Sequence, residues 1–294
     1  MRFSDFILNL DRRWIFLVTA LAVAIPLLNP IGFPVKVTTE VRNVYDYIES
    51  LQPGDKVLFS CEYDPSTKPE VHPMCIAAMY HCFKKDLKIV VIALWPQGAA
   101  LAEQAFAEAK VIVKEREGKE VKRGRDYVNL GYKTGGPMVI QSTGSGTQGL
   151  IDTFPKDIGG QPVSQIEVMQ GIKTIKDFKL VFSFSSGDPG VKQWVMIANA
   201  QFGSVIAGGT TGVSAPEFYP YLNFEEPMKG QLIGLLGALK GAAEYEHLMG
   251  LSGPAMAGMD AQSIVHLLLI VVIVLANVLY LVQRRHDRAA GGLL

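Results

Sequence analysis

The sequence feature that most constrains this chain is an uncharged apolar run near its C-terminus, IVHLLLIVVIVLANVLYLV, at residues 264–282. A helix over such a run can cross the hydrocarbon core of a bilayer, which is about 30 Å thick, at about 1.5 Å per residue. Tyr280 stands near one end, and the basic residues Arg284, Arg285 and Arg288 follow directly. A buried core helix rarely combines this length with such a basic flank, so the run predicts a transmembrane helix.

A second apolar stretch, WIFLVTALAVAIPLL at residues 14–28, follows the basic residues Arg2, Arg12 and Arg13. Two interpretations compete. The small residues at positions 20–24 fit the cleavage site of a secretory signal peptide, whereas an intact stretch would form an N-terminal anchor. Because the sequence retains these residues, we expect residues 1–34 to hold a short stub and an uncleaved transmembrane anchor that Pro26 kinks or ends.

The distribution of basic residues predicts the orientation of both spans. Arginines lie before the first apolar stretch and after the second. Between the two stretches, the basic residues that follow closely after the first are Lys36 and Arg42. No Lys or Arg occurs from residue 242 to residue 263. By the positive-inside rule both termini are cytoplasmic. We therefore expect two spans in the cytoplasmic (inner) membrane, with the segment between them on its outer face.

Two polar residues interrupt the C-terminal run, His266 and Asn277. Their separation is about three helical turns, so they share one helix face with Ile270 and Ile273. Polar groups at membrane depth need partners, which predicts that this face packs against another helix. The alternative for His266 is that its ring reaches water at the headgroup level.

The segment at residues 35–226 reads as one α/β domain. Val41, Val44, Ile48 and Leu51 recur at helical spacing, and the residues from 88 to 94 form a near-continuous apolar run. Such a run is typical of a strand buried on both faces of a parallel sheet. The alternation of strands and helices predicts a Rossmann-like, doubly wound, mainly parallel α/β sheet with a transmembrane helix at each end. We expect further strands at 56–63, 178–184 and 204–207, an edge strand at 126–132, and helices at 74–83, 99–109, 163–171 and 188–202.

The segment at residues 227–262 is expected to hold one unusual helix and a linker before the C-terminal span at 263–294. Four glycines follow one another at helical spacing, Gly230, Gly234, Gly237 and Gly241. Each glycine costs a helix interior about 0.5–1 kcal/mol relative to alanine, so close approach to a neighbour must offset the loss. The stripe predicts helix packing, either against the domain itself or between subunits of an oligomer.

Candidate catalytic residues follow the expected strands, because ligands of doubly wound sheets bind at the carboxyl ends of the strands. Carboxylates, a histidine and a serine could converge there as an acid/base or nucleophilic site. Asp188 is more simply a helix cap beside Pro189, and His72 is more simply a loop residue. The candidates are Asp64, His72, Ser186 and Asp188.

A glycine- and threonine-rich loop is a candidate ligand-binding site, because backbone N–H groups of such loops can cradle phosphate. It lacks the Lys of a Walker loop. The glycines at 144, 146 and 149 have dinucleotide-motif spacing, but no clear strand precedes them, so we expect no cofactor. Three cysteines lack zinc-site spacing, and we expect them in the core with no metal bound. The loop is Gly208, Gly209, Thr210, Thr211 and Gly212; the cysteines are Cys61, Cys75 and Cys82.

Composition narrows the functional classes. The chain has 28 basic and 28 acidic residues, and this balance argues against a nucleic-acid binder. No motif of adequate specificity assigns an enzymatic activity. The sequence therefore predicts a non-enzymatic subunit or scaffold in the lipid bilayer that forms a homo-oligomer or joins other membrane subunits. The alternative is a membrane-anchored hydrolase, transferase or small-ligand sensor that uses the carboxyl ends of the strands.

Overall fold

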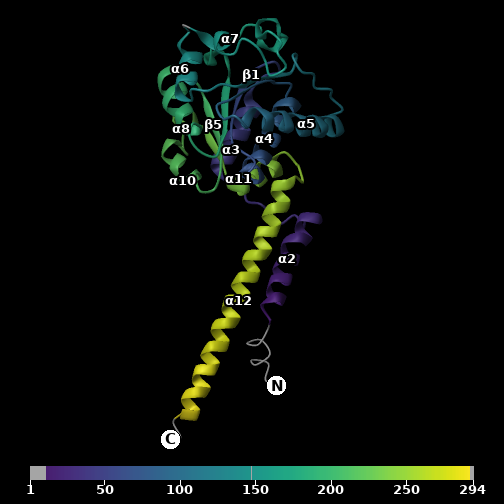
Figure 1. The fold of residues 1–294 in the computed structure, drawn as a ribbon, viewed down its shortest axis with the longest axis vertical. Coiled ribbons are helices and arrows are strands. Elements are labelled where there is room, and N and C mark those ends of the chain that lie inside the picture. Colours follow the sequence, from purple (N-terminus) through teal and green to yellow (C-terminus); the bar gives the residue numbers. More distant parts are fainter. Residues whose placement is uncertain (1–10, 147, 292–294) are drawn as a thin grey trace. The chain divides into compact units, whose positions relative to one another are not determined.

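The computed structural model describes residues 11–146 and 148–291 of the chain (Figure 1). The chain divides into two compact units. One unit is the α/β unit, Val35–Ala255. The other, which we call the anchor unit, joins the residues up to Pro34 with those from Met256 onward.

The α/β unit is built on a six-stranded sheet in which every neighbouring pair of strands is parallel. The strand order is β3-β2-β1-β4-β5-β6, so the order reverses between β1 and β4. Residue ranges are Lys56–Glu62 for β1, Lys88–Ala93 for β2, Tyr127–Tyr132 for β3, Leu180–Ser185 for β4, Ile206–Thr210 for β5 and Gly234–Gly237 for β6. The predicted parallel α/β sheet is confirmed, and β3 lies at an edge as expected.

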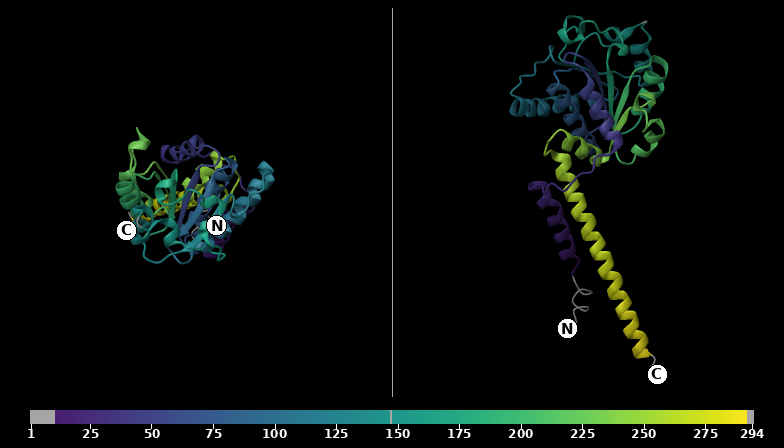
Figure 2. Two further views of the ribbon diagram at one scale, coloured as in Figure 1. Left: turned by 90° about the horizontal axis from the view of Figure 1, so that it is seen from above. Right: turned by 180° about the vertical axis from the view of Figure 1, so that it is seen from behind.

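Helices flank the sheet on both faces (Figures 1 and 2). Long helices precede or follow the first strands, and shorter segments follow β3, β4 and β5. Each strand except those at the edges is therefore covered on both sides, which explains the near-continuous apolar run of β2. The helices are α3 (Thr39–Ser50), α4 (Lys68–Lys84), α5 (Gly98–Glu117), α6 (Pro137–Ser145), α7 (Gly149–Thr153), α8 (Val191–Gln193), α9 (Ala200–Phe202), α10 (Ala215–Phe218) and α11 (Ala238–Leu248).

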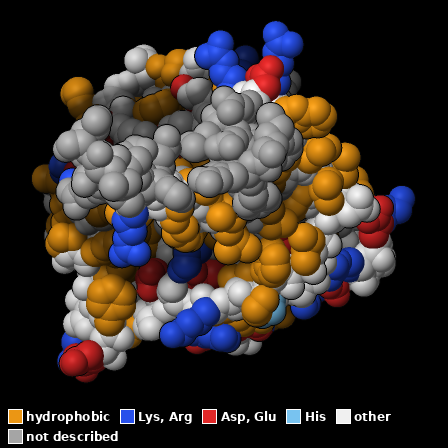
Figure 3. Space-filling model, turned by 90° about the horizontal axis from the view of Figure 1, so that it is seen from below, with side chains coloured by type: hydrophobic (Ala, Val, Ile, Leu, Met, Phe, Trp, Pro, Cys, Tyr) orange, Lys and Arg blue, Asp and Glu red, His pale blue; other side chains and the backbone are white. Residues whose placement is uncertain are grey.

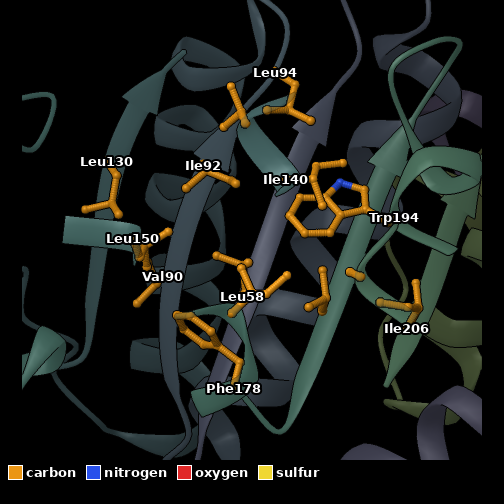
Figure 4. Packing of buried hydrophobic residues seen from close by; sticks show 14 of the residues in the cluster. Leu58, Val90, Ile92, Leu94, Leu130, Ile140, Leu150, Phe178, Trp194 and Ile206 are labelled. Carbon is orange, nitrogen blue, oxygen red and sulfur yellow. The ribbon is translucent and has the colours of Figure 1, made fainter. Parts of the chain in front are cut away.

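One layer of the core lies between the sheet and the helices that follow β3 and β4. Leu58, Val90 and Ile92 point from the sheet toward Ile140 on α6 and Trp194, and all five are buried (Figure 4). Trp194 begins a π-helical stretch, Trp194–Asn199, which continues α8. Successive side chains of a strand point to opposite faces of the sheet. Ser60 and Glu62 of β1 therefore lie on the same side of the sheet as Leu58, facing this layer.

The predicted glycine-striped helix is wrong. Gly234 and Gly237 bound β6, Gly230 lies in the preceding loop, and α11 begins after Gly237. A Cβ on Gly234 would stand 2.3 Å from the backbone oxygen of Glu40, so this glycine allows the edge strand to approach α3. The helix-like spacing of the four glycines thus has a different origin, because most of them serve a strand and its turns.

Two other helix predictions need correction. The segment expected as a helix over 163–171 holds two short 3₁₀ turns, Val163–Gln165 and Glu167–Met169. The helix expected from Asp188 begins instead at Val191, and Asp188 does not cap it. The hydroxyl of Ser185 takes that role, because its Oγ accepts the N–H of Val191 at 3.1 Å.

The anchor unit contains two helices, α2 (Arg12–Leu28) and most of α12 (Pro254–Gly291). Among the described residues, one helix is long and apolar enough to cross a membrane, over Pro254–Val282. The α2 helix has 17 residues and does not reach that length, so the N-terminal span stays a prediction. Residues 1–10, on which the arginine at position 2 falls, lie outside the described part of the chain.

Candidate functional site

The topological switch point lies between β1 and β4, where a parallel sheet of this order opens a crevice at its carboxyl edge. β1 ends with Glu62, which pairs in register with Ser185 of β4. Ser60 pairs with Ser183 in the same way. Polar side chains from two adjacent strands therefore meet at this point within an otherwise apolar sheet.

Glu62 is the centre of a buried hydrogen-bond cluster, which we call the Glu62 cluster. The carboxyl group accepts hydrogen bonds from the hydroxyls of Ser60 and Ser183, the latter at 3.2 Å. The indole N–H of Trp194 donates to Ser60 Oγ at 3.0 Å, so the donors run in one direction toward the carboxyl group. The side chains of all four residues are fully buried.

The charge state of Glu62 follows from two opposing effects. Burial disfavours the carboxylate and raises the pKa of Glu62 to about 8, although the hydroxyls of Ser60 and Ser183 and the backbone N–H of Leu94 favour ionisation. Burial prevails, so the group is mostly neutral at pH 7. A neutral carboxyl group at a switch point resembles the buried acids found at functional sites, but solvent does not reach this one.

Three of the four predicted catalytic residues follow neighbouring strands, Asp64 after β1 and Ser186 and Asp188 after β4, whereas His72 lies in α4. Asp64 Oδ1 accepts hydrogen bonds from the hydroxyl and N–H of Ser66, at 2.6 and 2.9 Å, and from the N–H of Thr67. These bonds hold the turn into α4. They also lower the pKa of Asp64, and the bond from the Ser66 hydroxyl has the largest effect. Asp188 is exposed, and Ser186 bonds to the backbone oxygen of Glu62.

His72 lies on α4, where its ring contacts Tyr63, which directly follows β1, and Glu108 on α5. Its Nδ1 is 2.7 Å from the hydroxyl of Tyr63, and its Nε2 is 3.3 Å from Glu108 on α5. Burial lowers the pKa of His72. The residue is part of α4, so the interpretation of His72 as a loop residue is wrong, whereas its role as a catalytic residue stays a prediction.

A matching arrangement surrounds His81, further along α4. Its Nδ1 is 2.7 Å from the hydroxyl of Tyr245 on α11, and its Nε2 is 3.0 Å from Glu49 on α3. Burial lowers the pKa of His81 to about 4, so the ring is neutral at pH 7. The two histidines satisfy buried polar groups where α4 packs against its neighbours, which is a structural role.

The predicted ligand-binding loop is mostly strand. Gly208, Gly209 and Thr210 belong to β5 and are buried. A Cβ on Gly208 would stand 2.9 Å from Leu235 Cδ1, so packing explains this glycine. The N–H of Gly212 faces the carboxylate of Glu70 at 3.3 Å, which makes the remaining turn less suited to a phosphate. Thr211 bonds to Ser214 instead.

A small pocket opens beside this turn, at the carboxyl ends of β5 and β6. It has a volume of about 170 Å³ and is lined by Thr38, Gly212, Tyr219 and Lys240, among others. The buried carboxylate of Glu244 accepts the N–H and the hydroxyl of Thr38, both at 2.7 Å, and the ammonium of Lys240. The pocket therefore lies where the α/β unit begins.

The three cysteines are buried in the core as predicted, and all are free thiols. Burial raises the pKa of Cys82, and the neighbouring Cys75 adds to the effect. Within the part of the chain that the structure describes, no group of His, Cys, Asp and Glu is arranged to hold a metal ion.

The sequence missed the Glu62 cluster because its members come from three distant segments. The available signal was a pair of polar residues, Ser60 and Glu62, two residues apart on an apolar strand, together with Ser183 on the apolar strand β4.

Comparisons with protein-family models, curated proteins and solved structures give no match for this chain.

Proposed function

We propose that this chain is a two-span membrane protein that serves as a non-enzymatic subunit or scaffold of a homo-oligomeric or larger membrane assembly. Both termini lie in the cytoplasm, and the α/β unit stands on the outer face of the cytoplasmic membrane. The observation that carries the proposal is the way in which the anchor unit joins its two apolar helices.

Asp260 ties the segment after α2 to the first turns of α12. Its Oδ2 accepts the N–H groups of Ile31 and Gly32, both at 2.8 Å, and its Oδ1 accepts the N–H of Phe33 at 3.0 Å. The Asp260 side chain is buried, so these charge-assisted bonds are sheltered from water. They join the C-terminal side of α2 to the N-terminal side of α12, as a helical hairpin requires.

Many apolar side chains of both helices are exposed. On α2 they include Trp14, Phe16, Leu21 and Leu28, and on α12 they continue from Leu267 to Val282. Soluble proteins rarely expose apolar patches of this extent, and a bilayer would cover them. A hairpin inserted in this way places both termini on the same side, in agreement with the positive-inside rule.

One face of α12 supports the subunit role. The half-buried residues Ile264, Leu268 and Leu279 share one side of the helix, and His266 and Asn277 lie on the opposite side. The amide of Asn277 donates to the backbone oxygen of Ile273 at 2.8 Å. His266 makes no hydrogen bond to any residue that the structure describes. A neighbouring helix would supply the missing partner for its ring.

The oligomeric state of the purified protein in lipid nanodiscs or mild detergent tests the proposal. We expect an assembly larger than a monomer, and expect the double variant His266→Leu, Asn277→Leu to shift it toward the monomer. Val278→Leu, on another face of the same helix, is the matched control and should leave the assembly intact. A wild-type protein that is monomeric with no copurifying subunit would contradict the proposal.

A second candidate function, a membrane-anchored small-ligand sensor, is favoured by the position of the Glu62 cluster at the switch point. A ligand that binds there would raise the melting temperature of the wild-type protein and would act less on Glu62→Gln. A panel of nucleotides, dinucleotides and organic acids that leaves the melting temperature unchanged would reject this candidate. A hydrolase or transferase is less favoured, because Asp64 is engaged by Ser66 and Thr67 in the turn before α4 and His72 is buried within α4.

A further inference from the structure

Exposed apolar side chains gather in one segment of the α/β unit, residues 213–228, between β5 and β6. Val213 is 93% exposed, Tyr219 44%, Phe224 51% and Met228 60%. Side chains of this size are otherwise mostly packed inside the unit, and the segment has its own buried residues, such as Phe218. We call the four exposed side chains the apolar rim.

One residue of the apolar rim, Tyr219, lies at the place where the α/β unit starts. Tyr219 and Thr38 line the same pocket, together with Pro216 and Gly212. Thr38 stands four residues after Pro34, the last residue of the N-terminal part of the anchor unit. Four residues of extended chain reach at most about 14 Å. The Tyr219 side of the rim is therefore close, along the chain through Thr38, to the end of the apolar anchor.

Two of the three glutamates in the segment of the rim are paired with lysines, whereas Glu225, beside Phe224, is exposed and takes part in no ion pair with a described residue. Lys192 pairs with Glu217 at 2.7 Å, and Lys229 pairs with Glu226 at 2.7 Å. Seen from below, the surface of the molecule shows hydrophobic patches beside charged side chains of both signs (Figure 3). Ion pairs next to exposed aromatic and aliphatic groups are suited to the interfacial layer of a membrane, where apolar groups contact lipid and charged groups contact water.

From these observations we infer that the apolar rim inserts shallowly into the headgroup and upper acyl layer of the membrane that holds the chain. This inference rests on the proposed membrane anchoring and adds a lipid contact of the α/β unit itself. Because the neighbouring lysines are paired with glutamates and Glu225 adds a negative charge, the contact depends on the apolar side chains and not on anionic lipids. The contact would fix the orientation of the α/β unit above the bilayer.

Depth-dependent quenching in nanodiscs tests this contact. Full-length variants that add one exposed cysteine, Val213→Cys and Phe224→Cys, are labelled with an environment-sensitive fluorophore and reconstituted in phosphatidylcholine that carries nitroxide lipids. The native cysteines are buried, and labelled wild-type protein gives the background. We expect both probes to lose fluorescence with shallow nitroxides and to show blue-shifted emission. Adding phosphatidylglycerol should change neither result.

Two reference probes separate the possible outcomes. Met138 is 78% exposed on α6, which lies apart from α10, so Met138→Cys should remain unquenched (Figure 1). Leu269→Cys on α12 reports the anchoring itself and should be quenched by deep nitroxides. Quenching at Leu269 without quenching at Val213 and Phe224 would overturn the rim contact alone. Absence of quenching at Leu269 would overturn the membrane anchoring. Blue-shifted rim probes without lipid quenching would indicate a protein partner and would also overturn the lipid contact.

Discussion

The two units of this chain differ in whether their apolar side chains are buried or exposed. In the α/β unit, leucine, valine, isoleucine and phenylalanine are mostly inside the protein, and polar residues such as Glu62 and His81 are buried with hydrogen-bond partners. In the anchor unit, apolar side chains point outward, and Asp260 is a buried polar group at the end of the hairpin. This contrast is what we expect if one unit folds in water and the other in lipid.

The largest expected effect is on the free energy of unfolding when a buried side chain of the α/β unit is truncated, compared with an outward side chain of the anchor unit. Trp194→Ala removes a fully buried side chain and the donor to Ser60, so it should lower the free energy of unfolding of the α/β unit by about 3–5 kcal/mol. Leu269→Ala, at an outward position of α12, should leave that free energy nearly unchanged. Denaturation of the full chain, followed by circular dichroism, measures both. Equal losses would break the comparison between the units.

A smaller effect is expected from acid. In the unfolded chain His81 titrates near the ordinary histidine pKa of 6.5, whereas its folded pKa is about 4, so the unfolded chain binds more protons between these values. Stability supplied by the neutral ring is complete above pH 6.5 and is lost as pH falls, by about 3 kcal/mol near pH 4. His81→Gln should flatten the pH dependence of the denaturation midpoint in this range. An unchanged slope would show that His81 is not the group that titrates.

The smallest of the three effects concerns the anchor unit. Asp260→Ala removes the acceptor of three backbone N–H groups, and charge-assisted bonds contribute about 1.5–3 kcal/mol. Amide hydrogens of Ile31, Gly32 and Phe33 should exchange about tenfold faster or more, because opening that segment becomes easier. Asp260→Asn, which keeps an oxygen acceptor, is the matched control and should show a smaller change. Slow exchange in both variants would remove the support for the hairpin.

Sequence patterns predicted the interior of the sheet and its β3 edge well, and its β6 edge poorly. The apolar runs of β1, β2 and β4 identify buried strands because both faces of each strand are covered. β6 is a four-residue edge strand with a glycine at each end, and those glycines happen to fall at helical spacing with Gly230 and Gly241. Spacing alone cannot distinguish glycines that pack helices from those that let a strand approach α3.

The candidate site was predictable only in its location. Strand order was unknown, but the carboxyl edge of a parallel sheet was a justified place to search. The Glu62 cluster depends on the register of β1 against β4 and on Trp194 from a third segment, which no local pattern encodes. His72 was placed at that edge because a loop was expected there, whereas α4 begins earlier, at Lys68, and buries the ring.

The most direct test of the proposed membrane arrangement is the topology of the chain in intact cells. Cysteines placed at Met138, which is exposed on α6, and at Ser4 and Leu294 can be probed with a membrane-impermeant maleimide before and after the cells are permeabilised. We expect Met138→Cys to react from outside, and Ser4→Cys and Leu294→Cys to react only after permeabilisation. Reaction of either terminal cysteine in intact cells, or protection of Met138→Cys from the reagent once the outer envelope is opened, would contradict the proposed arrangement.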